Sequence, residues 1–142
     1  MSIYQEALAI KDEIIANRRY LHQNPELGLD LPLTAAYVEK KLIEMGYEPK
    51  RVGEYGLTAT IGKEGGKCFL IRGDMDGLPV EEQAEVDFKS TNGKMHACGH
   101  DMHAAMLFGV LQRLNRNRDF EGTLFGIFHF FFCKVFHFLV HI

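Results

Sequence analysis

Apolar residues recur every three or four positions along three stretches of the chain, a spacing that predicts amphipathic helices. The first stretch starts at Ile3 and reaches Leu21, and it includes Ala7, Ile10 and Ile14. It must end by Asn24, because the proline that follows disfavours the α conformation in the residue before it. We therefore expect one amphipathic helix before Pro25.

The same spacing predicts two further helices. One starts near Pro32, with Asp30 as its candidate N-cap, and runs to Met45. It ends at Gly46, because glycine adopts the left-handed conformation after a helix without strain. The other follows Asp101, and its apolar positions are Ala104, Ala105, Leu107, Leu111 and Leu114.

Short apolar runs between these helices predict β-strands. Two of them, residues 57–61 and 68–71, flank a Lys-Glu-Gly-Gly turn and predict a hairpin, with Cys68 in the core. A further strand is expected to begin at Gly122. This mixture of helices and strands predicts an α/β fold, in which sites gather at strand ends and helix starts.

The composition is that of an ordinary soluble globular domain. The 142 residues are 46% hydrophobic and 25% charged, with a net charge of −3 and a pI near 6.1, so no basic surface suggests a nucleic-acid partner. Three cysteines form no even disulfide framework. Residues 1–20 contain Glu6, Lys11, Asp12 and Glu13 in place of an apolar leader core. The expected location is the reducing cytoplasm.

The last part of the chain differs from the rest. All 19 Asp and Glu lie at or before Glu121, whereas residues 124–142 carry one charged side chain, Lys134, and seven of the eleven Phe. Three interpretations remain open. The segment is long enough to span a bilayer, although its His and Lys would be costly there. It could instead form buried strands of a larger domain, or be translated out of frame from AT-rich codons, which is the interpretation we favour.

Two carboxylates, Asp74 and Asp76, stand where an apolar strand gives way to a Gly-Leu-Pro turn. At a strand end, side chains two positions apart can face one cation or orient a neighbouring imidazole. The alternative is ordinary turn chemistry, since Asp before Gly often bonds its own backbone.

A denser group of candidate ligands extends from His96 to His103. Within it, Cys98 and His100 are two positions apart and can bind one ion. Thiolate and imidazole together favour zinc or a neighbouring transition metal over magnesium or calcium. Asp101 either caps the helix that follows or enters the metal shell, and the sequence leaves both open.

Three segments, RRYLHQNPELG (18–28), RGDMDGLPVEE (72–82) and KMHACGHDMHAAM (94–106), resemble the N-terminal signatures of a metal-dependent amidohydrolase family. That family includes hippurate hydrolases, N-acyl-amino-acid amidohydrolases and hydrolases of indole-acetyl amino-acid conjugates. It is related to aminoacylases and zinc carboxypeptidases. The resemblance covers about residues 5–123. It implies an α/β fold that forms the N-terminal part of a zinc-peptidase-like catalytic domain, with helices packed on a mixed sheet and the lid domain absent.

The resemblance also implies roles for individual residues. Cys98 and His100 are expected to be ligands of a two-metal centre, with Asp74, Asp76, Asp101 and His103 in supporting positions around it. The two divalent ions would be zinc, manganese or similar metals, and the substrate would be an N-acyl amino acid or a short peptide. The segment around His22 resembles a structural signature and not a catalytic one.

The sequence departs from the family pattern at about Leu124. In the family, the strand that starts near Gly122 continues into a Glu-Glu pair that supplies the general base and a metal ligand, and further His ligands follow; here no Glu follows Glu121. We therefore assign no catalytic residue, and expect residues 1–123 to be a truncated, inactive part of the catalytic domain and residues 124–142 an aberrant tail.

Two alternatives to this reading remain. The chain could bind a single ion weakly without catalysis, or it could be a fragment tethered to a membrane through residues 124–142, although a membrane partner is not favoured. An unpaired sheet edge would also favour oligomers or aggregates.

Overall fold

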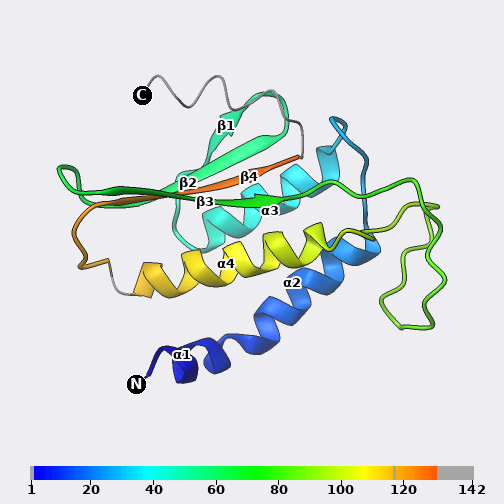
Figure 1. The fold of residues 1–142 in the computed structure, drawn as a ribbon, viewed down its shortest axis with the longest axis horizontal. Helices are drawn as coiled ribbons and strands as arrows, with labels where there is room; N and C mark the ends of the chain where they lie inside the picture. Colours follow the sequence, from blue (N-terminus) through cyan, green and yellow to red (C-terminus); the bar gives the residue numbers. More distant parts are fainter. Residues whose placement is uncertain (1, 117, 131–142) are drawn as a thin grey trace.

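The computed structural model describes residues 2–116 and 118–130. Along these residues follow α1 (Ile3–Ala9), α2 (Lys11–Gln23), α3 (Pro32–Glu44), β1 (Lys50–Val52), β2 (Gly56–Gly62), β3 (Cys68–Asp74), α4 (His100–Arg116) and β4 (Thr123–His129). The strands form one mixed sheet, and α3 and α4 lie against one of its faces, with α2 packed on α4 (Figure 1). The predicted α/β fold, with helices packed on a mixed sheet, is confirmed.

The first predicted helix is divided in two at Ile10. The backbone of this residue is not helical (φ −110°, ψ 7°), so α1 ends and α2 begins around it. The bend leaves the Ile10 side chain only 5% exposed, in a position where it approaches Gly109 of α4. α2 ends at Gln23, as the proline at position 25 predicts.

α3 starts where it was predicted, but Asp30 does not cap it. The carboxylate of Glu26 instead accepts hydrogen bonds from the backbone N–H groups of Leu33 (3.2 Å) and Thr34 (2.7 Å). A negative charge at this end of the helix also interacts favourably with the helix dipole. Gly46 follows the helix with φ +83°, as predicted.

The predicted hairpin between residues 57–61 and 68–71 is wrong. The strand order is β1-β2-β4-β3, so β4 lies between β2 and β3. β4 pairs antiparallel with β2 and parallel with β3, while β2 forms its hairpin with β1. Ile127 and Phe128 of β4 are 4% and 0% exposed. A central position between two strands removes the apolar surface of such a strand from water.

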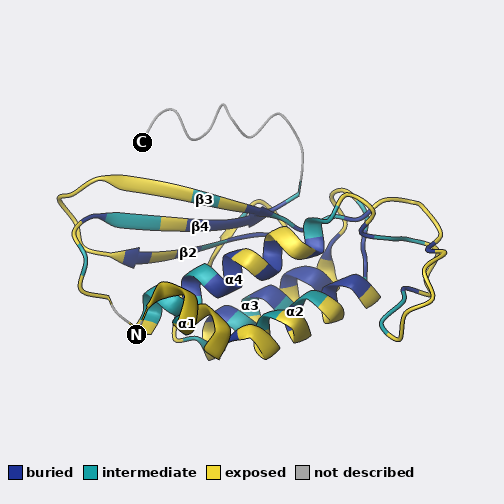
Figure 2. Cartoon of the chain, turned by 60° about the horizontal axis from the view of Figure 1, so that its bottom comes forward, coloured by how far each residue is buried: buried dark blue, intermediate teal, exposed yellow. Residues whose placement is uncertain are grey.

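β3 forms one edge of the sheet. Cys68 is exposed, which corrects its predicted place in the core, and Phe69 and Leu70 are 62% and 50% exposed. Figure 2 shows β3 largely exposed beside the buried part of β4. An edge strand with apolar side chains is a template for pairing with another strand.

The structure describes only part of the apolar C-terminal segment, residues 124–142. Residues 124–129 belong to β4, so the predicted boundary at residue 124 falls inside a central strand. Residues 131–142 lie outside the described residues. Within the described ranges, none of the helices has the length and apolar character needed to cross a membrane.

The core between the sheet and α4 also fixes where the candidate ligands lie. The rings of Phe108 in α4 and Phe128 in β4 are 4.8 Å apart between centroids. At Gly73 the strand approaches α4 so closely that a Cβ atom would lie 3.2 Å from the backbone oxygen of His103. The end of β3 is therefore held against the first turn of α4.

Replacing both Phe69 and Leu70 by Lys should reduce self-association, because charge on an edge strand disfavours strand addition. Light scattering over a concentration series measures the effect. The matched control is Leu33→Lys, since Leu33 is 61% exposed but lies on α3. Equal self-association in the two variants would show that the β3 edge is not the cause.

Candidate metal centre

Candidate ligands converge where β3 ends and α4 begins. Asp74 is the last residue of β3, and His100 and His103 occupy the first turn of α4. Each of these residues offers one ligand atom, and the three atoms lie within 4.8 Å of one another. Of the six site residues predicted from the sequence, the structure brings these three together as one group.

Asp76 orients the ring of His100. The Nδ1 atom of His100 lies 2.8 Å from the backbone oxygen of Asp76 and 3.1 Å from its Oδ1. Because a carbonyl oxygen can only accept, Nδ1 carries the hydrogen, and the lone pair of the neutral ring is on Nε2. Metal-binding histidines are commonly fixed by such a contact through their other nitrogen.

Asp74 has partners on both of its oxygens. Oδ1 accepts a hydrogen bond from Nε of Arg72 at 2.7 Å, and Oδ2 lies 3.5 Å from Nδ1 of His103. The Asp74 side chain is 14% exposed and that of His103 is 44% exposed. The rings of His100 and His103 are 5.4 Å apart between centroids.

Cys98 lies outside this group. Its side chain is exposed, and among the described residues it joins no set of three potential ligands. Gly99, with φ +81°, turns the chain between Cys98 and His100. A metal ion held by Cys98 and His100 together therefore stays a prediction.

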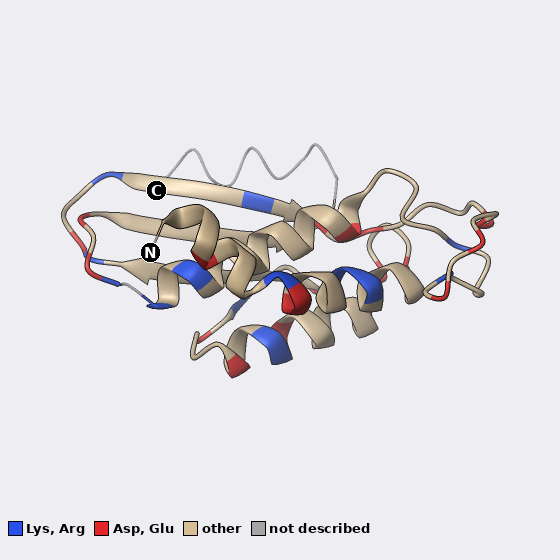
Figure 3. Ribbon diagram, turned by 90° about the horizontal axis from the view of Figure 1, so that it is seen from below, with Lys and Arg blue, Asp and Glu red and all other residues tan. Residues whose placement is uncertain are grey.

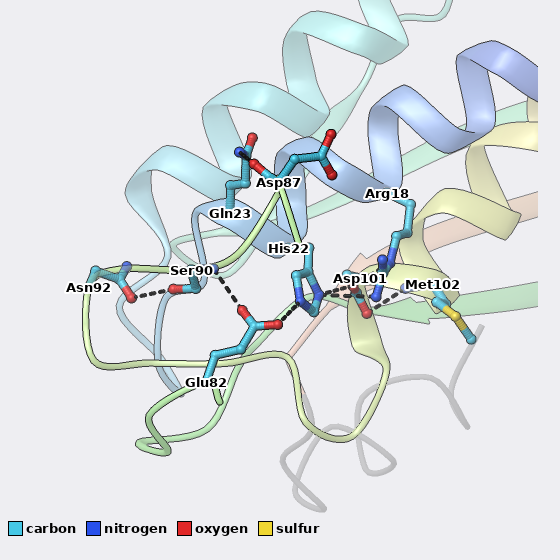
Figure 4. A network of polar contacts seen from close by, with 9 residues as sticks. All are labelled: Arg18, His22, Gln23, Glu82, Asp87, Ser90, Asn92, Asp101 and Met102. Atoms are coloured by element: carbon cyan, nitrogen blue, oxygen red, sulfur yellow. Dashed lines mark hydrogen bonds and ion pairs between the residues drawn. The ribbon is translucent and has the colours of Figure 1, made fainter. Parts of the chain in front are cut away.

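Asp101 is engaged in a buried polar network and not in the group of candidate ligands. Its Oδ2 lies 2.7 Å from Nδ1 of His22 and 2.8 Å from Nε of Arg18, while Oδ1 accepts the N–H of Met102 (Figure 4). The Asp101 side chain is fully buried. Both carboxylate oxygens thus have protein partners.

His22 connects this network to the long loop between β3 and α4 (Figure 4). Its Nε2 lies 2.8 Å from Oε1 of Glu82, whose Oε2 accepts the N–H of Ser90 at 2.7 Å. Burial raises the pKa of Glu82, but the hydrogen bonds from His22 and Ser90 outweigh it, and the pKa is lowered overall. The loop that carries Asp76 and Cys98 is therefore anchored to α2.

Sequence reasoning placed His22 in a structural signature but did not identify its partners. Asp101 and Glu82 are 79 and 60 positions away from it. No local spacing links residues so far apart. The signal that was available is the type of residue, since a histidine on the buried side of an amphipathic helix needs polar partners.

His96 is buried without a hydrogen-bond partner among the described residues. It is 4% exposed, and neither ring nitrogen is paired. Burial lowers the pKa of His96 to about 4, so its ring is neutral at neutral pH.

Charged side chains of both signs are interspersed over the helices around this region (Figure 3). Several of them form surface pairs, such as Lys41 with Glu44 on α3, and Glu39 of α3 with Arg51 of β1. Pairs of this kind contribute little to stability, whereas removing one partner from a buried network such as that of His22 leaves a buried charge uncompensated and is strongly destabilising.

Comparison with known proteins matches the same part of the chain. Residues 70–133 match the model of a family described as Peptidase family M20/M25/M40. This range contains most of β3, the loop, α4 and β4, and with them all six site residues predicted from the sequence.

Curated relatives and a solved structure extend the match toward the N-terminus. The chain is 46% identical over 116 residues to thermostable carboxypeptidase 2 of Saccharolobus solfataricus. It is 42% identical over 113 residues to an N-acyl-L-amino acid amidohydrolase of Geobacillus stearothermophilus. Each alignment covers 78% of this chain, but 29% and 30% of the relative.

The solved structure is the Bacillus subtilis protein YXEP, described as a dinuclear metal binding peptidase from the M20 family. It matches with a TM-score of 0.80 and 38% identity, over 84% of this chain and 35% of that one. The chain thus spans about a third of the length of the relatives that it matches.

The variant His22→Ala should lower the free energy of unfolding by about 3–5 kcal/mol, because it leaves two buried carboxylates without their shared partner. Urea unfolding measures the change. Gln23→Ala is the control, since this neighbouring side chain is exposed and makes only a 3.5 Å contact with the backbone of Asp87. A loss in His22→Ala no larger than in the control would contradict the proposed importance of the network.

The buried ring of His96 predicts a pH dependence of stability. Its pKa is about 4 in the fold against an ordinary value of 6.5, so between these values the unfolded chain binds a proton that the folded chain does not. The free energy of unfolding is therefore highest, as far as His96 is concerned, above pH 6.5, and it decreases as the pH falls toward 4. In His96→Phe, the free energy of unfolding should fall less steeply over this window, and an unchanged slope would refute the assignment.

Proposed function

Because residues 70–133 match the model of peptidase family M20/M25/M40, we propose that the chain is the N-terminal part of a dinuclear-metal amidohydrolase that cleaves the amide bond of N-acyl amino acids. The observation that carries the proposal is the junction of β3 and α4, where Asp76 holds Nδ1 of His100 and leaves Nε2 for an ion. One relative is named an N-acyl-L-amino acid amidohydrolase, and a solved relative is described as binding two metals. In this proposal Cys98 and His100 are the ligands that the chain supplies.

The donors at this junction fit the ions that such chemistry uses. Imidazole, carboxylate and thiolate are ligands of zinc and neighbouring transition metals. Bound divalent ions supply a water molecule with a pKa near neutrality and a polarised amide carbonyl. The products of the reaction are a carboxylic acid and a free amino acid.

The chain's own residues have positioning roles in this proposal. Asp76 fixes the ring of His100, and the contact between His22 and Asp101 fixes the start of α4. Glu82 anchors the loop that brings Cys98 to the junction. A displacement of the metal-binding side chains by about 1 Å is enough to lower the rate of catalysis. The buried contacts of His22 and Glu82 would prevent such a displacement.

We further propose that this chain does not hydrolyse amides by itself. A proton acceptor must lie within hydrogen-bond reach of the attacking water. Glu82 is already engaged by His22 and Ser90, and Glu121 is the last acidic residue in the sequence. The general base would therefore have to come from residues that this sequence does not contain.

We retain the out-of-frame interpretation for the residues beyond the sheet. β4 ends at residue 129 and the family match runs to residue 133, and both support a boundary later than residue 124. Translation of the encoding DNA in three frames from the codon of Asp119 tests this. A frame that leads into a Glu-Glu pair supports the interpretation, and the absence of one contradicts it.

A chimera tests the function directly. Residues 1–130 of this chain replace the corresponding N-terminal part of the Geobacillus N-acyl-L-amino acid amidohydrolase, and hydrolysis of N-acetyl amino acids is measured with added zinc or manganese. The chimera should be active, whereas the chain alone should not be. Cys98→Ser and His100→Ala should each reduce the rate by more than about a hundredfold, beyond the loss typical of residues around the ligands.

Cys68→Ser is the matched control in the chimera, because Cys68 is also exposed but lies at the start of β3. It should leave the rate unchanged. A folded chimera that does not hydrolyse N-acetyl amino acids would reject the proposed function. A chimera that keeps its full rate in Cys98→Ser would reject Cys98 as a ligand.

A further inference from the structure

We infer that this chain forms a symmetric dimer in which β3 pairs antiparallel with β3 of a second copy. A two-fold axis perpendicular to the sheets would join the two four-stranded sheets into one continuous sheet, with α4 of both copies on the same face. The inference concerns the 142-residue chain itself and does not depend on the proposed hydrolysis.

The first argument is that the edge of β3 is unprotected. β3 ends the strand order, and among the described residues its one neighbour is β4 (Figure 2). The backbone oxygen of Lys67 accepts a hydrogen bond from β4, so the alternate residues Cys68, Leu70 and Arg72 turn their backbone groups outward. Edge strands are commonly protected by charges, proline or a bulge. Residues 68–71 contain no charge or proline, and the register with β4 has no offset.

The second argument is the register that the side chains allow. A Cβ atom at Gly73 would lie 3.3 Å from Leu107, so Gly73, Ile71 and Phe69 share the face that α4 covers, and Leu70 points to the other. The helices of both copies share one face only if residues of the same face lie opposite each other. Pairing about Leu70 satisfies this condition. It places Leu70 on the axis and Phe69 opposite Ile71, a favourable aromatic and β-branched pair.

The third argument is the position of α4. Cβ atoms at Gly73 of β3 and Gly126 of β4 would both approach Leu107, so the helix lies over this pair of strands. In the joined sheet, the two copies of α4 would be separated by two strand spacings, or about 10 Å. Packed helices have axes about 8–10 Å apart. The dimer therefore brings the two helices into contact without displacing either of them.

The fourth argument is an apolar stripe on the side of α4 next to the free edge. Met102, Met106 and Val110 are spaced by four positions along the helix, and the two methionines are 51% and 57% exposed. Met106 and Val110 line a groove of about 500 Å³ together with Ile71 of β3. In the dimer this stripe faces its own copy across the axis. Methionine adapts its shape to such a contact.

The fifth argument is charge. Lys67 immediately precedes β3, and Asp74 ends it. Antiparallel pairing brings the basic start of each strand toward the acidic end of the other, whereas parallel pairing would bring like charges together. The edge is thus complementary to itself in the antiparallel direction, which is why we assign a second copy of this chain as its partner.

Sedimentation velocity of the full chain over a concentration series tests the dimer. We expect a monomer–dimer equilibrium in which Met106→Lys raises the dissociation constant by more than about tenfold, because two like charges would meet across the axis. Ile43→Lys is the matched control, since Ile43 is 59% exposed but lies on α3. It should leave the dissociation constant unchanged. Circular dichroism checks that both variants fold.

Disulfide trapping tests the register. In a chain whose three native cysteines are replaced by Ser, Leu70→Cys places two thiols opposite each other at the axis. The Cα atoms of such an antiparallel pair are about 5.5 Å apart, which a disulfide can bridge. Mild oxidation should therefore link most of the Leu70→Cys chains into covalent dimers, and Ile43→Cys should give few.

Three results would overturn the inference. These are a monomer at all concentrations, species that grow beyond the dimer without limit, and equal yields of covalent dimer from Leu70→Cys and Ile43→Cys. Equal dissociation constants for Met106→Lys and Ile43→Lys would reject the contact between the two copies of α4. An inactive chimera would bear only on the proposed function.

Discussion

The ring of His22, held between the buried carboxylates of Asp101 and Glu82, is the interaction on which the geometry of the candidate centre depends. A buried carboxylate without a partner costs several kcal/mol, so the fold must keep both carboxylates within hydrogen-bond distance of the His22 ring. Asp101 lies in the first turn of α4, and Glu82 belongs to the loop before it. The position of the loop, and with it of Asp76, is therefore tied to α2.

The topology of the sheet explains why donors gather at one end of it. β3 and β4 are parallel, and α4 forms the connection between them. Side chains at the carboxyl end of β3 thus meet those at the start of α4, the place where α/β folds commonly bind ligands. β4 occupies the centre because its apolar residues need strands on both sides, and this leaves β3 at the edge.

Neighbouring residues at the start of α4 have different roles because successive helical positions point about 100° apart. Asp101 is fully buried in the network with His22, whereas His100 and His103 belong to the group of potential ligands with Asp74. The sequence left two roles open for Asp101, capping or metal ligation. In the structure Oδ1 accepts the N–H of Met102 in the first turn of α4, and Oδ2 faces Arg18 and His22, so the side chain also joins the helix to α2.

The sequence by itself determined the features that depend on near neighbours. These are the helical stretches, apart from the break at Ile10, the ends of α2 and α3 before Pro25 and Gly46, the start of β4, and the dense group of donors at residues 96–103. Apolar spacing, proline and glycine act on residues within one or two helical turns, so the local sequence is enough to predict their effects. Only the tertiary structure decided the strand order, the cap that Glu26 supplies to α3, and the partners of His22. Each of these is a choice between surfaces distant in sequence, made by burial and hydrogen bonding across the whole fold, and no local spacing encodes it.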